Sequence, residues 1–295
     1  MKSIPNLSRI TAVIVLYNTT DLVFKCLDKI KDVNIIIVDN GKNDLKIINS
    51  IKKKYKILKY FKLNKNIGFG RACNFAFRYV KTEYTLLIEP DVIIEKSSIQ
   101  NLILTLDKYP EAGMTTPRFV DENLKIIDYL GDFQENWKGV KRNELENDLN
   151  HRLSKTFIDG DTCINFCLAA ILLLNNQVIK KSGLFNKKIF LYWEDFDLCR
   201  RLKKNKIPII KSFKSTAIHF ERKSVKENFF NKFIMTVHND KSAYIYFNVK
   251  KNNPIILKRI LIYTFRSITY FFILNLKNSF KNLARLYAIY LFLKS

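Results

Sequence analysis

Buried-strand patterns and amphipathic helix patterns alternate over residues 10–110, and no other feature of the sequence constrains the fold as strongly. The runs ITAVIVLY (Ile10 to Tyr17) and NIIIVDN (Asn34 to Asn40) are apolar and β-branched, as strands buried on both faces are. Alternating strands and helices fold into doubly wound sheets with right-handed crossovers. We therefore expect an α/β fold, with further strands at 59–63 and 84–92 and helices at 21–30, 44–54 and 69–80.

Polar residues follow three of these strands. Asn18 follows the first strand, Asp39 lies at the end of the second, and Glu89 and Asp91 end the strand at 84–92. Ligands of open α/β sheets bind outside the carboxyl ends of the strands. These four side chains are therefore the first candidates for a binding site.

Glu89 and Asp91 are two carboxylates separated by one proline. Such a pair can share Mg²⁺ or Mn²⁺, which takes carboxylate and substrate phosphate oxygens as ligands. A divalent cation neutralises the charge on a departing diphosphate. An acidic turn after a strand is more often an ordinary solvated loop, so the pair alone does not establish a metal site.

Three acids cluster in the segment WEDFDL. Glu194, Asp195 and Asp197 follow Tyr192 and Trp193 and precede a basic helical segment. Acids at a helix N-terminus complement the helix dipole and pair with later arginines, which explains one or two of the three. The aromatic neighbours suit stacking on a sugar ring, and one of the carboxylates can serve as a general base towards a hydroxyl group.

The segment Asn66 to Gly70 precedes a helix and contains two glycines. Its spacing is not Gly-x-Gly-x-x-Gly, and no acid follows at the distance that a dinucleotide site requires. A dehydrogenase is therefore excluded. The glycines still allow the backbone to approach a nucleotide at a helix N-terminus.

The composition limits the partners and the compartment. The chain has 295 residues, of which 47% are hydrophobic, and a formal net charge of +24 that predicts attraction to anions. Five isolated cysteines and three histidines disfavour a zinc site, and cysteines buried on apolar faces fit a reducing compartment. Because residues 1–10 lack the apolar stretch of a signal peptide, we expect a cytoplasmic protein.

The C-terminal part is expected to form two long helical tracts, at about 226–250 and 255–293. No acidic residue follows Asp240. The stretch 255–276 is apolar and is interrupted by Lys258, Arg259 and Arg266. Apolar bulk with basic and no acidic residues suits a helix lying on an anionic membrane surface. The alternative is a tail packed on the rest of the chain or on a second copy in a homo-oligomer.

Residues 129–157 are polar, lack periodicity and include Trp137. We expect this stretch to be a solvent loop or a mobile lid.

Six segments, taken in order, resemble glycosyltransferase family 2, and within it the bacterial rhamnosyltransferase-like branch. They are VIVLYN, IIIVDN, NKNIGFGRACN, LLIEPDV, GLFNKKIFLYWEDFDLCRR and AIHFERKS, and they span about residues 10–225. The resemblance implies the GT-A fold, a doubly wound mixed sheet with a nucleotide-binding half at about 10–110 and an acceptor half at 111–225. We accordingly expect a domain at 1–225 followed by basic C-terminal helices at 226–295.

The resemblance also implies functions for particular residues. It implies that Asp195 is the catalytic base and that Asp91 is the metal-binding acid of the family's Asp-x-Asp element. Ser224 matches a common companion of His219. The expected acceptor-binding residues are Tyr192, Trp193 and Glu194. The metal is expected to contact Glu89 and His219 as well. The expected nucleotide-binding residues are Tyr17, Asn18, Asp39, Asn66, Gly68 and Arg71.

The chain departs from the family pattern at two places. Glu89 stands where relatives of this branch often carry asparagine, which affects the choice and tightness of the metal. The segment LLLNNQ (Leu172 to Gln177) lacks an arginine that many relatives have near this point, so acceptor or phosphate contacts are expected to differ there.

The reaction that the resemblance implies is a single displacement with inversion, assisted by Mn²⁺ or Mg²⁺. The expected donor is dTDP-linked rhamnose, and the alternative is a UDP-linked hexose or N-acetylhexosamine. The expected acceptor is a saccharide or a lipid-linked glycan in cell-surface polysaccharide synthesis, reached from the inner face of the cytoplasmic membrane.

Two other function classes fit the sequence less well. A nucleic-acid-binding protein is favoured by charge alone, because the basic residues are spread along the chain and form no recognised motif. A nucleotidyltransferase would carry a glycine-rich loop directly after the first strand, where this chain has Leu16 to Thr19.

Overall fold

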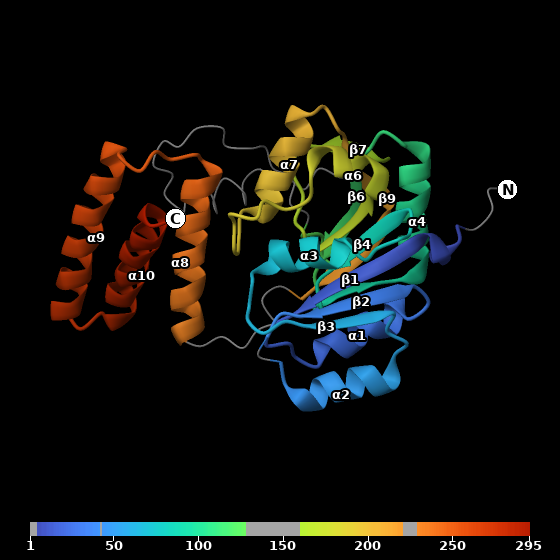
Figure 1. Cartoon of the computed structure of the whole chain (residues 1–295), viewed down its shortest axis with the longest axis horizontal. Coiled ribbons are helices and arrows are strands. Elements are labelled where there is room, and N and C mark those ends of the chain that lie inside the picture. The colour runs from blue at the N-terminus through green and yellow to red at the C-terminus, as the bar shows by residue number, and fades with distance from the viewer. Residues whose placement is uncertain (1–4, 42, 128–159, 221–228) are drawn as a thin grey trace. The chain divides into compact units, whose positions relative to one another are not determined.

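The computed structural model describes residues 5–41, 43–127, 160–220 and 229–295 (Figure 1). These residues divide into two compact units. The first unit holds the described residues from 5 to 185 and from 195 to 220, and the second holds 186–194 and 229–295. The stretch 129–157 with Trp137, expected to be a solvent loop or a mobile lid, lies outside the described residues.

A mixed sheet forms the centre of the first unit (Figure 1). The parallel strands β3-β2-β1-β4 come first in its spatial order, followed by β8-β6-β9-β5, and β7 pairs with β9. The strands are β1 Ile10–Leu16, β2 Asn34–Asp39, β3 Lys59–Lys62, β4 Tyr84–Ile88, β5 Val92–Ile94, β6 Met114–Val120, β7 Thr162–Ile164, β8 Ile171–Asn175 and β9 Ile209–His219. The helices are η1 Leu7–Arg9, α1 Leu22–Ile30, α2 Leu45–Lys54, α3 Phe69–Phe77, α4 Lys96–Lys108, α6 Asn176–Ser182 and α7 Glu194–Lys204.

Helices cover both faces of the sheet. Ile14 and Ile35 belong to a core with side chains of α1, α2 and α4, whereas Val13 and Ile36 belong to a second core with side chains of α3, α6 and α7. Successive residues of a strand point to opposite faces. Every residue of β1 is therefore buried, and the doubly wound α/β architecture expected from the sequence is confirmed.

The single strand expected at 84–92 is two strands. β4 ends at Ile88, and a turn follows in which the Val92 N–H donates to the Glu89 carbonyl at 3.1 Å. β5 then pairs with β9 at the other end of the strand order. Pro90 has no N–H to donate to a neighbouring strand, which explains why the ladder stops there.

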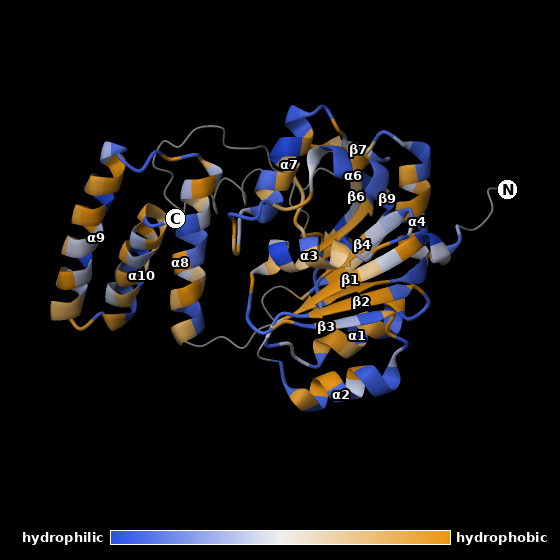
Figure 2. Ribbon diagram, in the orientation of Figure 1, coloured by the Kyte–Doolittle hydropathy of each residue, from blue (hydrophilic) through white to orange (hydrophobic). Residues whose placement is uncertain are grey.

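The second unit contains, in its described part, the helices α8 Phe229–Tyr246, α9 Pro254–Phe272 and α10 Leu276–Leu293. Tyr244, Ile256, Ile289 and Phe292 form a small core between them. Figure 2 shows that hydrophobic and hydrophilic residues alternate along these helices. No described helix is sufficiently long and apolar to cross a membrane.

The expectation of one helical tract over 255–293 is wrong. The chain turns after α9, where Leu274 has a φ of +57° and cannot continue a right-handed helix. The Asn275 side chain then accepts a hydrogen bond from the Asn278 N–H at 3.3 Å and caps α10.

The five cysteines are free, and Cys26, Cys73, Cys167 and Cys199 are buried as expected. Cys163 is exposed instead. It lies on β7, a three-residue strand that pairs only with β9 among the described strands.

A network of ion pairs centred on Arg9 lies at the start of β1. The Arg9 guanidinium donates to both carboxylate oxygens of Glu83 at 2.7 and 2.8 Å and to both of Asp107 at 2.9 and 2.7 Å. It also lies 5.0 Å from the ring centroid of Tyr84. Bidentate pairs of this kind are the stronger surface ion pairs because the planar fork is already oriented.

Replacing Arg9 with methionine removes both pairs and should lower the free energy of unfolding by about 1–2 kcal/mol. Urea denaturation followed by circular dichroism measures this loss. As a matched control, Lys96→Met removes the single exposed pair to Asp32 at 2.8 Å and should cost less. Equal losses in the two variants would contradict the importance of the Arg9 network.

Candidate active site

The ends of β1, β2 and β4 bring the polar residues predicted from the sequence to one edge of the sheet. β1 pairs in parallel with both neighbours, so its carboxyl end lies beside theirs. The Asn40 N–H donates to the Leu16 carbonyl at 2.8 Å and joins two of these ends. Tyr17 and Asn18 follow β1 and are partly exposed. Asn18 has a left-handed φ of +48°, an uncommon conformation that is often found at functional sites.

Asp39 is buried at this edge and is held by fixed hydrogen bonds. Its Oδ2 accepts from the Tyr60 hydroxyl at 2.6 Å, and its Oδ1 accepts from the Asn43 amide at 2.5 Å and the Gly41 N–H at 3.1 Å. Burial and the bond to Asp39 raise the pKa of Tyr60, so the phenol remains a donor. Because a carboxylate has about four acceptor positions, Asp39 retains capacity for a further donor.

Asn66 and Gly68 shape the start of α3. Asn66 Oδ1 accepts from Asn40 Nδ2 at 2.9 Å and from the Gly68 N–H at 2.8 Å, while Asn40 Oδ1 accepts from the Ile67 N–H at 3.0 Å. Gly68 has φ +89° and ψ 157°, a conformation that is open essentially only to glycine. Arg71 is exposed in the first turn of α3.

Glu89, Asp91 and His219 converge, with one ligand atom from each lying within 4.8 Å of the others. The pairing of β5 with β9 creates this cluster. Val92 lies opposite His219, and the Phe220 N–H donates to the Asp91 carbonyl at 3.1 Å. Asp91 is buried, whereas the Glu89 side chain is 33% exposed. A ligand can therefore approach the cluster from the Glu89 side.

The donor set of this cluster fits a hard divalent cation. Carboxylate oxygens suit Mg²⁺ and Mn²⁺, and imidazole is a further ligand for transition metals. His219 Nε2 lies 3.7 Å from Glu89 Oε2, and no described residue forms a hydrogen bond with the buried Nδ1 of His219. Burial lowers the pKa of His219, but the nearby carboxylate of Glu89 and the charge of Asp91 outweigh burial and raise it. The negative charge gathered here thus favours a positive partner.

Asp195 lies in the first turn of α7 and remains partly exposed. The surrounding protein nevertheless desolvates it, and this burial raises its pKa to about 6. The charge of Glu89 also raises this pKa, and the backbone N–H of Phe196, which donates to Oδ1 at 2.8 Å, opposes the increase. Asp195 therefore lies within electrostatic reach of Glu89, one of the three residues of the cluster. A carboxyl with a pKa near neutral pH is suited to take a proton from a hydroxyl.

Asp197, the third acid of this segment, has a structural partner. It forms an ion pair with Arg201 at 2.8 Å and lies 3.7 Å from Arg200. Arg201 also ties α7 to the end of α6 by donating to the carbonyls of Ser182, Gly183 and Leu184. The pairing with later arginines expected of helix acids thus applies to Asp197.

Tyr192 and Trp193 precede α7 with φ values of 64° and 69°. Bulky residues rarely adopt this left-handed region, and such strain is often found at functional sites. Within the second unit, Trp193 packs against Tyr246 and Phe247 at the end of α8, with ring centroids 5.2 and 5.4 Å apart. Glu194, the next residue in the chain, is buried.

Two further contacts fix the segment before Tyr192 to α8. The Ser242 hydroxyl donates to the Leu191 carbonyl at 2.9 Å, and the Phe190 ring stacks on His238 with centroids 4.1 Å apart. Burial lowers the pKa of His238 to about 4, so this imidazole is neutral and packs as an aromatic ring. α8 therefore holds the segment that carries the two aromatic side chains.

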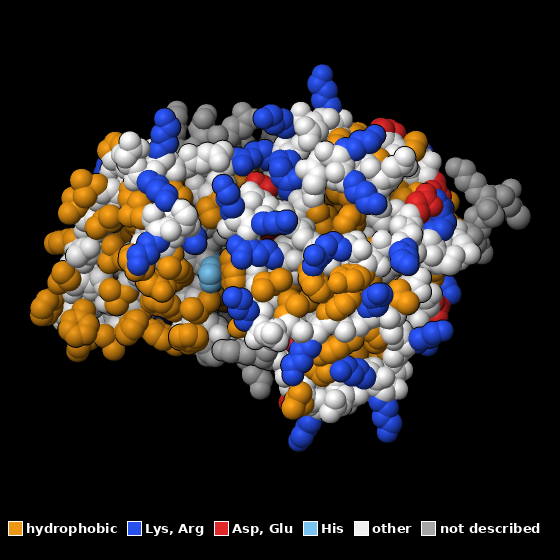
Figure 3. All heavy atoms as spheres, viewed as in Figure 1, with side chains coloured by type: hydrophobic (Ala, Val, Ile, Leu, Met, Phe, Trp, Pro, Cys, Tyr) orange, Lys and Arg blue, Asp and Glu red, His pale blue; other side chains and the backbone are white. Residues whose placement is uncertain are grey.

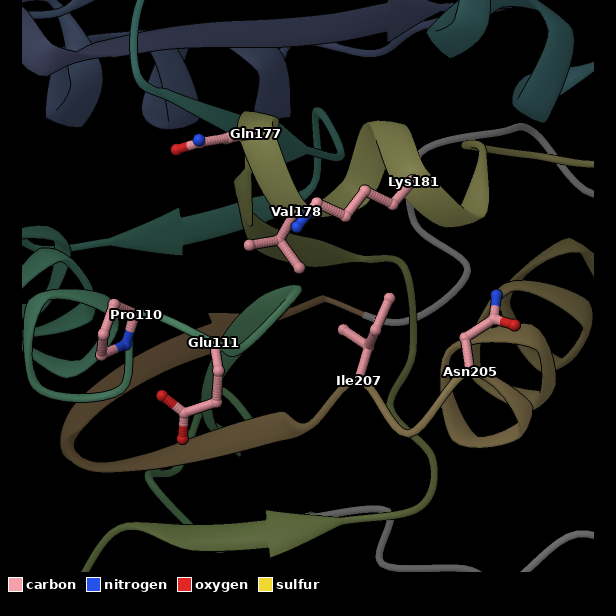
Figure 4. A pocket seen from close by; sticks show the side chains of 7 residues that line it. All are labelled: Pro110, Glu111, Gln177, Val178, Lys181, Asn205 and Ile207. Carbon is pink, nitrogen blue, oxygen red and sulfur yellow. The ribbon is translucent and has the colours of Figure 1, made fainter.

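A pocket of about 530 Å³ lies elsewhere in the first unit (Figure 4). It is lined by Pro110, Glu111, Gln177, Val178, Lys181, Asn205 and Ile207. None of the site residues predicted from the sequence lines it, so the pocket and the acidic cluster are separate features.

Tyr60 and Asn43 both contact Asp39, but neither is among the site residues predicted from the sequence. Asn43 lies four residues after Asp39 in a polar loop, which was a usable signal. Tyr60 lies in the short strand β3, and nothing in the sequence connected it with Asp39. Ser224, the expected companion of His219, lies outside the described residues.

Comparison with known sequences gives two similarities. The family model described as Glycosyl transferase family 2 matches residues 11–163. Rhamnosyltransferase WbbL from Escherichia coli (strain K12) is 26% identical over 209 residues, which cover 64% of this chain and 75% of that protein.

Solved structures share the fold at low sequence identity. GalNAc-T7, solved with UDP, GalNAc and Mn²⁺, has a TM-score of 0.60 at 14% identity, and the match covers 90% of this chain and 51% of that one. This chain thus spans about half the length of GalNAc-T7. The mannosyltransferase PcManGT from Pyrobaculum calidifontis, solved with GDP-Man and Mn²⁺, has a TM-score of 0.53 at 13% identity, covering 95% of this chain and 72% of that one. These similarities confirm the GT-A type of fold.

Replacing Ser242 with alanine should loosen the segment 186–193, because the hydroxyl bond to Leu191 is lost. Hydrogen exchange measured by mass spectrometry should become roughly fivefold faster in that segment, as expected for about 1 kcal/mol. The control is Thr236→Ala, whose hydroxyl bonds only to the Lys232 carbonyl within α8 among the described contacts. Unchanged exchange in Ser242→Ala would contradict the anchoring role of α8.

Proposed function

Because this chain belongs to glycosyl transferase family 2, we propose that it is an inverting transferase that moves a sugar from a nucleotide diphosphate to a saccharide hydroxyl. One observation carries the proposal. Asp195, whose pKa is raised to about 6, lies within electrostatic reach of Glu89, which belongs to the Glu89–Asp91–His219 cluster at the carboxyl edge of the sheet. Attack of a hydroxyl group on a sugar diphosphate requires a general base close to a site that binds a cation.

The proposed nucleotide site lies at the ends of β1 and β2. Asp39 is held by Tyr60, Asn43 and Gly41, which fixes its carboxylate for the N3–H of uracil or thymine. The other proposed nucleotide contacts are Tyr17, Asn18, Asn66, Gly68 and Arg71.

The proposed donor is dTDP-linked rhamnose. The similar protein from E. coli is named a rhamnosyltransferase, which supports this choice. A UDP-linked hexose or N-acetylhexosamine is the alternative, since one structure of similar fold was solved with UDP and GalNAc.

Glu89, Asp91 and His219 would hold the divalent cation, Mn²⁺ or Mg²⁺. The bound cation would offset the negative charge of the nucleotide diphosphate. Because Glu89 supplies a carboxylate where relatives often carry asparagine, we propose that this chain binds the cation through two acids and an imidazole.

Asp195 takes the proton from the acceptor hydroxyl in the proposed mechanism. The hydroxyl oxygen then forms its bond to the anomeric carbon while the bond from that carbon to the diphosphate breaks on the opposite side, so the configuration inverts. Tyr192 and Trp193 would stack on the acceptor sugar, and Glu194 would contact its hydroxyls.

The proposed acceptor is a glycan or a lipid-linked saccharide of the cell surface. We propose a domain at 1–225 that carries the reaction and basic helices at 226–295 that attach to the inner face of the cytoplasmic membrane. The strongly positive charge and the absence of acids after Asp240 support an anionic membrane partner over a second copy of the chain.

Asp195→Asn should lower the rate of nucleotide diphosphate release by about 10²–10⁴-fold, because no base then takes the hydroxyl proton. Turnover is measured over a panel of dTDP- and UDP-sugars with a saccharide acceptor and Mn²⁺. The matched control is Glu111→Gln, an exposed acid at the separate pocket, which should retain the full rate.

Asp91→Asn should weaken Mn²⁺ binding by about tenfold or more in calorimetry, because a buried carboxylate ligand is lost. The same Glu111→Gln control should bind Mn²⁺ as tightly as the unaltered chain. Unchanged Mn²⁺ affinity in Asp91→Asn would contradict the proposed cation site.

The turnover number at saturating Mn²⁺ and donor should fall as the pH is lowered through about 6. Asp195 accepts a proton only when it is ionised, so protonation below its pKa of about 6 removes the base. A bound cation counteracts the charge of Glu89, so the inflection should lie at or below this value. A turnover number that stays constant down to pH values well below Asp195's pKa would exclude Asp195 as the base.

A further inference from the structure

The α9 helix presents a continuous apolar face to solvent. Leu257, Leu261, Phe265, Ile268 and Phe272 are each 52–78% exposed. At about 100° per residue these five positions fall within roughly 80° of the helix circumference. The inner face is different: Ile256 and Ser267 are buried against neighbouring helices of the same unit. α9 is therefore apolar on a second face that no described residue covers.

The turn between α9 and α10 extends this face. Phe271, Ile273, Leu274 and Leu276 are 59%, 62%, 83% and 47% exposed. Figure 3 shows hydrophobic side chains gathered over this part of the second unit. Monomeric soluble proteins rarely expose large contiguous apolar patches, and such patches mark sites of protein or membrane interaction.

The charges around the face are all of one sign. Residues 241–295 contain ten lysines and arginines and no acidic residue. Lys258 and Arg266 are exposed on α9, and Lys277 and Lys281 are exposed at the start of α10. A second copy of this chain docking through the same surface would bring like charges together. An anionic lipid surface would complement both the charge and the apolar side chains.

We propose that α9 and the α9–α10 turn form a membrane-docking surface that binds anionic lipid, with Phe272 and Leu274 inserted beneath the headgroups. The lysines and arginines beside the apolar face contact lipid phosphates, as in helices that lie in the membrane interface. This inference deepens the membrane attachment contained in the proposed function, since it names the residues that enter the bilayer. It does not depend on the identity of the donor sugar.

The test is sedimentation of the full chain with lipid vesicles. Vesicles of phosphatidylcholine containing phosphatidylglycerol should bind the chain, vesicles of phosphatidylcholine alone should bind it more weakly, and added salt should weaken binding. The double variant Phe272→Asp and Leu274→Asp should reduce binding about tenfold or more, because two inserted side chains are lost and two negative charges are added.

The matched control is the double variant Leu45→Asp and Leu58→Asp, which likewise replaces two exposed apolar side chains with aspartates, here in the first unit. It should bind vesicles as the unaltered chain does. Both variants alter exposed side chains, and an unchanged melting temperature verifies that each is folded. Absence of vesicle binding, or an equal loss in both double variants, would overturn the docking surface.

Two further measurements separate this inference from its alternatives. A stable dimer in analytical ultracentrifugation that the Phe272 and Leu274 substitutions dissociate would assign the face to a second copy and overturn the proposal. Binding of dTDP or UDP without vesicles should be unchanged in the docking variant. Failure of nucleotide binding in the unaltered chain, with vesicle binding intact, would count against the transferase and leave the docking surface standing.

Discussion

The parallel pairing of β1 with both β2 and β4 is the constraint on which the rest of the structure depends. Every residue of β1 is buried, and successive side chains enter different cores. A slip of one residue would exchange those faces, so burial fixes the register. The register in turn fixes where Tyr17, Asp39 and Glu89 leave the sheet, and all of them emerge at its carboxyl edge.

The turn after β4 supplies two of the acidic side chains at this edge of the sheet. It carries Glu89 and Asp91 away from β4 and delivers the chain to β5, whose pairing with β9 sets His219 beside them. Burial raises the pKa of Asp195, and the negative charge of Glu89 adds to this increase. Residues with perturbed pKa values are often found at functional sites because the surrounding fold keeps them in unfavourable positions. Here Arg201 holds α7 in place, because it forms an ion pair with Asp197 and donates a hydrogen bond to the Ser182 carbonyl at the end of α6.

The helices of the second unit hold the segment before α7 and also expose apolar side chains to solvent. α8 holds this segment through the ring contact of Trp193 with Tyr246 and the hydrogen bond from the Ser242 hydroxyl to the Leu191 carbonyl. α9 and the turn after it direct large apolar side chains outward. The same helical unit therefore anchors the segment 186–193 through α8 and presents, on α9, an apolar surface that suits an anionic membrane.

The sequence by itself determined the alternation of strands and helices, the carboxyl-edge candidates and the aromatic-acidic segment at 192–197, because periodicity and local clustering are properties of neighbouring residues. It did not reveal that 84–92 divides at Pro90, that 255–293 divides at Leu274, or that Tyr60 and Asn43 hold Asp39. Only the tertiary structure decided that His219 joins Glu89 and Asp91 and that burial raises the pKa of Asp195 to about 6. Those properties depend on strand pairing and burial between residues far apart in the chain, which no local pattern records.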